Sequence, residues 1–263
     1  MSDIINTVAK LASNMYRLGW DERNGGNISC RLSEKELDGI CDINKTIRRI
    51  DLPFDAKALA GEIFIVTATG SYFRNIEYEP DKNLGIFRIA QDGHTLELLW
   101  GYSDGGRPTS ELPAHLMTHI ERMKTDPESR VVIHTHATNT LAMTYVHTLD
   151  EEQFTKTLWR MCTECVVVFP DGVAVLPWML CGTDEIGMAT AEKMRSFRLV
   201  VWAQHGIFAA GRSPDETFGL IETVEKAAEI YMKTAHLPIV NTISDEQLKQ
   251  LAEAFHVKPA FDL

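Results

Sequence analysis

Three histidines have the types and spacing of a metal site. His134 and His136 flank Thr135 at the end of the apolar run 131–133, and His205 closes a second apolar run. Residues two apart in a strand project to the same face, so the first two rings can converge on one ion. His205 would add a third imidazole from another strand end. Three neutral nitrogens and an open coordination position are typical of a catalytic zinc site.

Glu111 lies next to Ser110, at the start of an expected helix. A carboxylate in a first helical turn usually only stabilises the helix dipole, by about 0.3–1 kcal/mol. Beside a metal ion, the same carboxylate could be displaced by substrate and then move protons. The ion would polarise a carbonyl, which favours a retro-aldol cleavage without a Schiff base. No lysine lies in an apolar strand, which argues against a lysine-dependent aldolase.

Two other clusters could bind a metal, but their context favours a structural interpretation. His115 and His119 are four residues apart on an expected helix and have no obvious third partner, so we interpret them as packing residues or as neighbours of the site. Cys162 and Cys165 have the spacing of a redox or zinc pair, but they lead into an apolar run that we read as a strand. Five cysteines without a sign of secretion are typical of reduced thiols in the cytoplasm.

Three turns rich in hydrogen-bond donors could hold the phosphate of a small substrate. Residues 21–29 contain two adjacent glycines and two asparagines and feed a strand, and residues 67–71 follow another strand. Residues 109–110 precede an expected helix, whose N-terminus favours anions. Each turn alone would be unremarkable in an ordinary protein. No P-loop or dinucleotide fingerprint occurs, so a nucleotide is not implied.

Length and charge limit the possible partners. The chain has 263 residues and a formal net charge of −11. Phosphate backbones and anionic headgroups would be repelled, so we expect neither nucleic acid nor a membrane as a partner. The apolar runs are too short to span a bilayer, and the N-terminus is typical of an amphipathic helix rather than a signal peptide. No linker or repeat divides the chain, so we expect one domain over residues 1–263.

Hydrophobic periodicity predicts the elements that must position these residues. Helices are expected at residues 3–18, 113–124, 137–146, 151–160, 183–195, 214–234 and 244–255. Strands are expected at residues 63–67, 84–90, 96–100, 131–136, 164–169, 173–176, 199–203 and 206–210, with β-hairpins at 166–176 and 200–210. Since several strands follow one another without a helix between them, we predict an α/β fold with a mixed, largely antiparallel central sheet and helices on both faces.

The chain resembles the zinc-dependent class II aldolases of the fuculose/rhamnulose-phosphate type, which share an α/β fold with the adducin head. The motifs that carry the resemblance occur in the family's order over nearly the whole chain. They are GGNIS, VTATG, PTSELPAH, HTHATN, VFPDGVAVLPW, GTDEIG, QHGIF and DETFGLIETVEKAA. WDERNGGN and TSELPAH are most similar to the rhamnulose-phosphate branch. Residues 34–59 match weakly, and we assign them no role.

The resemblance implies a function and a set of site residues. The reaction would be cleavage of L-rhamnulose 1-phosphate to dihydroxyacetone phosphate and L-lactaldehyde, in rhamnose catabolism. One zinc ion per subunit would be bound by His134, His136 and His205, with Glu111 as the acid/base. A homotetramer with C4 symmetry is also implied, in which Glu164 reaches the site of a neighbouring subunit. The residues implied in phosphate binding are Asn24, Gly26, Asn27, Thr69, Gly70, Thr109 and Ser110.

Related functions remain open alternatives at this point. Thr69 stands where the family has a serine, but it keeps the hydroxyl that a phosphate needs. An L-fuculose-phosphate aldolase, a ribulose-phosphate 4-epimerase or a methylthioribulose-phosphate dehydratase would use the same three histidines. A non-catalytic domain like the adducin head would have lost ligands, whereas all three histidines and Glu111 are present.

Overall fold

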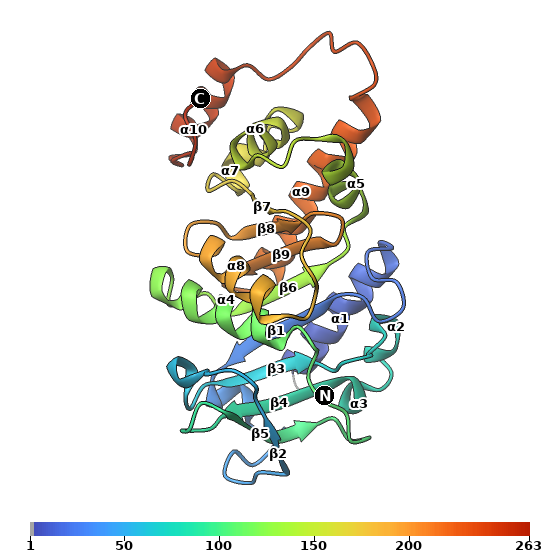
Figure 1. The fold of residues 1–263 in the computed structure, drawn as a ribbon, viewed down its shortest axis with the longest axis vertical. Coiled ribbons are helices and arrows are strands. Elements are labelled where there is room, and N and C mark those ends of the chain that lie inside the picture. Colours follow the sequence, from blue (N-terminus) through green and yellow to red (C-terminus); the bar gives the residue numbers. More distant parts are fainter. Residues whose placement is uncertain (1–2) are drawn as a thin grey trace.

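A single nine-stranded sheet is the centre of the computed structural model within residues 3–263, the part of the chain that the structure describes (Figure 1). Residues 1–2 lie outside this part. The strand order is β2-β5-β4-β3-β1-β6-β9-β8-β7, and every neighbouring pair is antiparallel except β7 and β8. The predicted mixed, largely antiparallel sheet is therefore confirmed. The strands are β1 (Asn27–Leu32), β2 (Arg48–Asp51), β3 (Ile63–Thr67), β4 (Leu84–Ile89), β5 (Thr95–Gly101), β6 (Val131–Thr135), β7 (Ala174–Leu176), β8 (Leu199–Trp202) and β9 (Gly206–Gly211).

The longer helices lie close to their predicted ranges. They are α1 (Asp3–Arg17), α4 (Leu112–Thr125), α5 (Thr138–Val146), α6 (Glu151–Met161), α8 (Asp184–Lys193), α9 (Pro214–Thr234) and α10 (Asp245–Ala254). Short turns of helix occur at α2 (Phe73–Ile76), α3 (Pro80–Asn83) and α7 (Cys165–Val168) and, as 3₁₀ turns, at Glu34–Leu37 and Lys57–Leu59. In Figure 1, α10 lies at the end of the molecule beyond β7, where it packs on α7. None of the helices in the described part of the chain is both long and apolar enough to cross a membrane.

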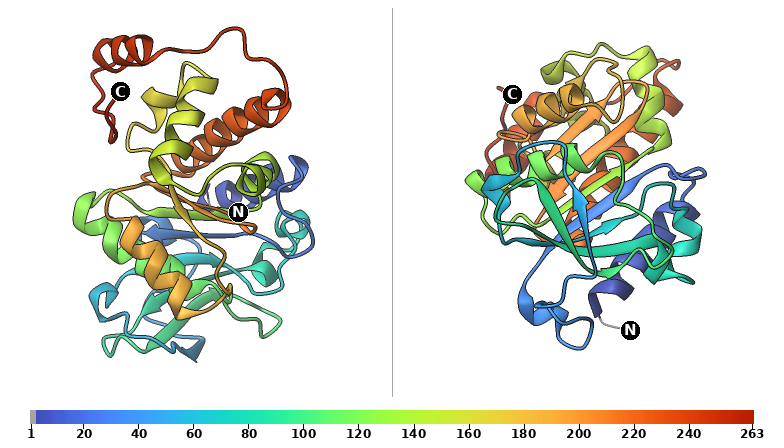
Figure 2. Two further views of the ribbon diagram at one scale, coloured as in Figure 1. Left: turned by 45° about the horizontal axis from the view of Figure 1, so that its top comes forward. Right: turned by 60° about the horizontal axis from the view of Figure 1, so that its bottom comes forward.

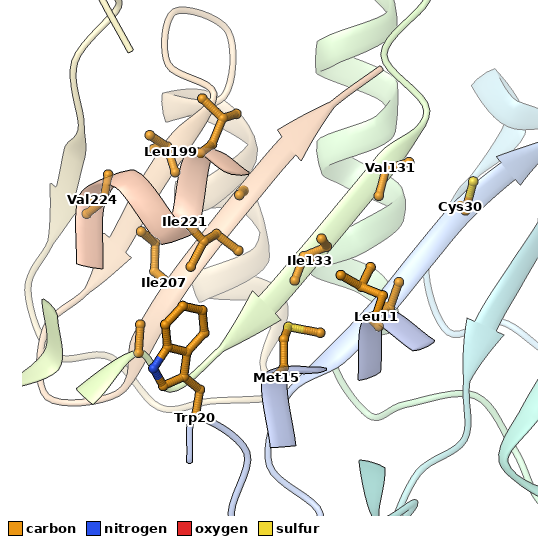
Figure 3. Close-up of a cluster of buried hydrophobic side chains, with 14 of the residues drawn as sticks. Leu11, Met15, Trp20, Cys30, Val131, Ile133, Leu199, Ile207, Ile221 and Val224 are labelled. Atoms are coloured by element: carbon orange, nitrogen blue, oxygen red, sulfur yellow. The ribbon is translucent and has the colours of Figure 1, made fainter. Parts of the chain in front are cut away.

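Side-chain alternation in the strands creates an apolar layer on each face of the sheet. Val131 and Ile133 of β6 are fully buried in one cluster with Leu11 of α1 and Ile221 of α9 (Figure 3). Val132, between them, points to the opposite face and packs with residues of α4 and α8. These two helices lie side by side on that face (Figure 2). The prediction of helices on both faces is confirmed.

The expected strand at residues 164–169 and the hairpin at residues 166–176 are wrong. Residues 165–168 form the short helix α7, which packs against α6, α9 and α10 with Cys165 and Val166 buried. The strand β7 then pairs in parallel with β8. Periodicity cannot separate a short apolar run in a strand from a buried helical turn, and tertiary packing decides here for the helix. The hairpin at residues 200–210 is confirmed, since β8 and β9 pair antiparallel with Trp202 opposite Gly206.

The strand β1 links the turn at residues 21–26, here called the glycine turn, to the predicted metal site. It lies between β3 and β6, and its first residue, Asn27, pairs directly with His134 of β6. Its faces are almost entirely buried, so the register is fixed by packing on both sides. The glycine turn before Asn27 is thereby held against the end of β6 that carries the histidines. In segment 34–59, to which we assigned no role, the strand β2 extends the sheet edge beside β5.

The buried His119 of α4 makes folding sensitive to acid. Burial lowers its pKa to about 3, whereas an unfolded histidine titrates near about 6.5. Between these values the unfolded state binds a proton that the folded state does not bind. The contribution of His119 to the free energy of unfolding is therefore fully present above pH ~6.5 and falls as the pH decreases. At pH 5 the cost is about 2 kcal/mol. We expect His119→Leu to flatten this dependence in urea unfolding at pH 7.5 and 5. An unchanged slope would show that the pKa of His119 is not lowered in the native state.

Candidate active site

The structure brings the three predicted histidines together at one rim of the sheet. His134 is on β6, His136 follows the end of β6, and His205 lies in the turn between β8 and β9. One ring nitrogen from each lies within 4.8 Å of the others. The ring centroids are 4.8 to 5.3 Å apart. Among the described residues, this is the cluster with the geometry to bind a metal ion.

The environment of His134 fits a metal ligand. Its Nδ1 donates to the backbone carbonyl of Ile207 over 3.1 Å, so the lone pair is on Nε2. That Nε2 is buried and has no hydrogen-bond partner. Burial, together with the nearby His136, lowers the pKa of His134 well below its usual value, so the ring is neutral. A buried, neutral and unpaired nitrogen that faces two other imidazoles is a fitting ligand for a divalent cation.

The other two rings also have the properties of ligands. His136 Nδ1 lies 3.0 Å from both carboxylate oxygens of Glu22, an arrangement that directs the other nitrogen of the ring to an ion. Burial, with the nearby His134, lowers the pKa of His205 to about 4. Glu22 was not among the residues predicted from the sequence. Its position in the turn after the first helix was a signal, but only the folded structure pairs it with His136.

Glu111 lies beside the histidines and does not cap its helix. It is the residue before α4, yet its side chain accepts no hydrogen bond from the backbone of that helix. Its Oε2 instead accepts from Asn27 Nδ2 at 2.8 Å. Its carboxylate oxygens lie 3.7 Å from His134 Nε2 and 3.8 Å from His205 Nε2. The carboxylate is thus close enough to the cluster to be a displaceable ligand or a base.

A pocket of about 310 Å³ joins these groups to the three donor-rich turns. Glu111 and the three histidines line it. All seven residues expected to bind phosphate also line it: Asn24, Gly26, Asn27, Thr69, Gly70, Thr109 and Ser110. Gly26 and Gly70 have φ of +73° and +72°, a backbone conformation that other residues rarely adopt. A Cβ at Gly26 would also lie 1.8 Å from Asp21 Oδ1, so this turn requires glycine.

The remaining candidate residues lie outside the pocket. Glu164 is exposed before α7 and accepts a hydrogen bond from Cys162 Sγ at 2.7 Å. It does not reach the histidines of its own chain, and its expected action on a neighbouring subunit stays a prediction. Cys162 and Cys165 are free thiols beside a helical turn rather than a strand. His115 and His119 both contact Ser29 Oγ and are packed inside the protein.

Comparison with known proteins identifies the family. The family described as class II aldolase and adducin N-terminal domain matches residues 6–232, and the chain belongs to it. It is 58% identical to the rhamnulose-1-phosphate aldolase of Listeria monocytogenes serotype 4b, over 97% of this chain and 93% of the relative. It is 46% identical to that of Klebsiella pneumoniae, over 97% and 94%. The crystal structure of a sugar-phosphate aldolase from Thermotoga maritima aligns with a TM-score of 0.77 and 30% identity, over 90% of this chain and 97% of that one. The chain is therefore a class II aldolase, an aldehyde-lyase, with high similarity to rhamnulose-1-phosphate aldolases.

Gly206 offers a test of how tightly the histidines are held. A Cβ there would lie 2.5 Å from the Thr135 carbonyl oxygen and 2.9 Å from His134 Cε1. Since the carbonyl belongs to the central strand β6, it cannot move away cheaply. We expect Gly206→Ala to fold but to bind a divalent metal ion at least about tenfold more weakly, as measured with zinc in competition with a chelator. Gly219→Ala, where a Cβ meets nothing within 4 Å, is the control. Equal zinc affinity in the two variants would contradict the close approach.

Proposed function

We propose that this enzyme cleaves L-rhamnulose 1-phosphate to dihydroxyacetone phosphate and L-lactaldehyde, in cytoplasmic rhamnose catabolism. One observation carries the proposal: a single pocket of about 310 Å³ contains the three histidines, the carboxylate and the donor-rich turns. The choice of sugar is supported by identities of 46% and 58% to rhamnulose-1-phosphate aldolases over nearly their full lengths.

We propose one zinc ion per subunit, held by His134, His136 and His205. Three neutral imidazoles suit zinc, and His134 Nε2 is a buried nitrogen that otherwise has no partner. When bound, the ion would act as a Lewis acid towards the ketose oxygens. Glu22 would keep the His136 ring in place through the contact to Nδ1.

Glu111 would move the proton that the reaction requires. In the cleavage direction the C4 hydroxyl loses its proton, the C3–C4 bond breaks, and its electron pair remains on C3. C3 must then gain a proton to give dihydroxyacetone phosphate. The Glu111 carboxylate lies 3.7 and 3.8 Å from the nearest nitrogens of His134 and His205, and it is nearly buried. This position supports the role of acid/base at C3.

The phosphate of the substrate would be bound where the three turns meet. Backbone N–H groups at Gly26 and Gly70 and the side chains of Asn24, Thr69 and Ser110 would be its donors. Thr109 and Ser110 also lie directly before α4, whose N-terminus attracts negative charge. Asn27, the seventh residue expected to bind phosphate, lies at the same pocket wall, where its side-chain amide donates to Glu111.

We also propose the C4 homotetramer, in which Glu164 would complete the site of a neighbouring subunit. Glu164 is exposed on its own chain, as this role requires. Several large apolar side chains are exposed as well, which supports burial against other copies. They are Tyr145, Val146, Trp178, Leu180 and Met188.

Replacing Glu111 separates proton transfer from metal binding. We expect Glu111→Ala to lower kcat by about 10²–10⁴, because general acid/base groups contribute this much. Zinc should remain bound at one ion per subunit, since the three histidines are unchanged. The measurements are steady-state kinetics and metal analysis on the same preparation. Unchanged turnover in the zinc-loaded variant would remove Glu111 from the mechanism.

The substrate assignment is tested by comparing two sugar phosphates. The zinc-loaded enzyme should have a higher kcat/KM for L-rhamnulose 1-phosphate than for L-fuculose 1-phosphate, in an assay that detects dihydroxyacetone phosphate. Removing the metal with a chelator should abolish both activities, and added zinc should restore them. A preference for the fuculose ester would overturn the assignment while leaving the aldolase class intact.

A further inference from the structure

A buried chain of polar side chains leads from Glu111 away from the pocket. Asn27 Nδ2 donates to Glu111 Oε2 at 2.8 Å, and Asn27 Oδ1 contacts His115 Nε2. On the far side of that ring, His115 Nδ1 lies 2.7 Å from Ser29 Oγ. Ser29 Oγ in turn lies 2.8 Å from His119 Nε2. All five residues are buried; Ser29, His115 and His119 are fully enclosed, whereas Asn27 and Glu111 border the pocket.

The chemistry of the groups fixes the direction of each hydrogen bond. The Asn27 amide presents its NH₂ to the Glu111 side chain and its carbonyl oxygen to His115. A carbonyl oxygen only accepts, which places a hydrogen on His115 Nε2. Burial lowers the pKa of His115 and His119, so each ring is neutral and has a single N–H. Ser29 then donates to His115 Nδ1 and accepts from His119 Nε2, and every donor points towards Glu111.

Two matched periodicities build this chain. Glu111, His115 and His119 are spaced by four residues, which is about 6 Å along one face of a helix. Asn27 and Ser29 are spaced by two residues, which is about 7 Å along one face of a strand. Because these two repeats are nearly equal, successive side chains of residues 111–119 can contact successive side chains of β1.

We propose that His115 is a positioning residue, which orients the Asn27 amide so that this amide holds Glu111 beside the histidine cluster. Without a donor at His115, the Asn27 amide could rotate and turn its carbonyl oxygen towards the carboxylate, which would repel Glu111. The Asn27 side chain then acts mainly on Glu111 rather than on the substrate phosphate. This inference rests on the proposed role of Glu111 as the acid/base.

The primary test replaces His115 in two ways in the full-length, zinc-loaded enzyme. His115→Leu removes the donor to Asn27, and we expect kcat to fall by about tenfold to a hundredfold. KM and the zinc content should change by less than about twofold, because neither the phosphate turns nor the metal ligands lose a contact. His115→Gln can still donate to Asn27 Oδ1 and should recover most of the lost kcat. Equal kcat in His115→Leu and the wild type would overturn the proposal.

His119→Leu is the matched control. It removes a buried histidine from the same face of α4, one turn farther from Glu111, and leaves the contact between Asn27 and His115 intact. We expect its thermal stability to fall about as much as that of His115→Leu, with kcat within about twofold of the wild type. Equal losses of kcat in the two leucine variants would reduce His115 to a packing residue and overturn the proposal.

A double-mutant cycle tests whether His115 acts through Asn27. Asn27→Ala should lower kcat with little change in KM, and adding His115→Leu should cost less than about a further twofold. Additive losses, or an Asn27→Ala variant whose main defect is a raised KM, would overturn the inference. If His115→Leu fails to fold, His115→Gln and Asn27→Ala still carry the test. Unchanged turnover in Glu111→Ala would instead refute the proposed role of Glu111. A failure of the proposed function can therefore be distinguished from a failure of this inference.

Discussion

The pairing of β1 with β6 is the constraint on which the site depends. Asn27 lies opposite His134 in this ladder, so the same backbone hydrogen bonds that hold the sheet together also place the glycine turn beside the histidine cluster. A shift of one residue would turn Asn27 and Ser29 to the other face and separate them from α4. Both faces of β1 and β6 are buried, so such a shift would leave buried polar groups without hydrogen-bond partners. The apolar packing on both faces of β1 and β6 thus fixes the register that places the site residues, as well as the fold.

Placing imidazoles at this rim has an energetic cost that a cation would offset. His134 Nε2 is buried without a partner, and an unsatisfied buried polar atom costs about 1–3 kcal/mol. Protonation would not relieve this cost, because burial and the neighbouring His136 ring disfavour the charged form. A divalent ion that binds the lone pair would relieve it. Metal affinity and folding stability are therefore linked at this residue.

The sequence predicted those features that depend on residue type at short spacing. His134 and His136 are two residues apart in a strand, so the convergence of their rings could be predicted. The adjacent glycines Gly25 and Gly26 likewise indicated a turn. The short helix α7 could not be predicted, because the apolar run after Glu164 has no hydrophobic periodicity. Its helical state depends on packing against α6, α9 and α10. Glu22 was missed as a neighbour of the site, and the contact of His115 with Asn27 was not foreseen, for a similar reason. Their partners are more than 80 residues away in the chain, and only the register of β1, β6 and α4 pairs them.

The distribution of acidic residues reconciles a chain of charge −11 with the binding of an anion. Helices α6, α8, α9 and α10 each begin with two acidic residues in the first turn, which occupy the positive end of the helix dipole. The N-terminus of α5 is occupied by the Glu225 carboxylate, which accepts four hydrogen bonds from Asn139 and Thr140. In contrast, α4 has no acid in its first turn, and the Asn27 amide draws the preceding Glu111 side chain away from the helix backbone. Since this N-terminus opens on the pocket behind Thr109 and Ser110, its positive end is available where the proposed phosphate would bind.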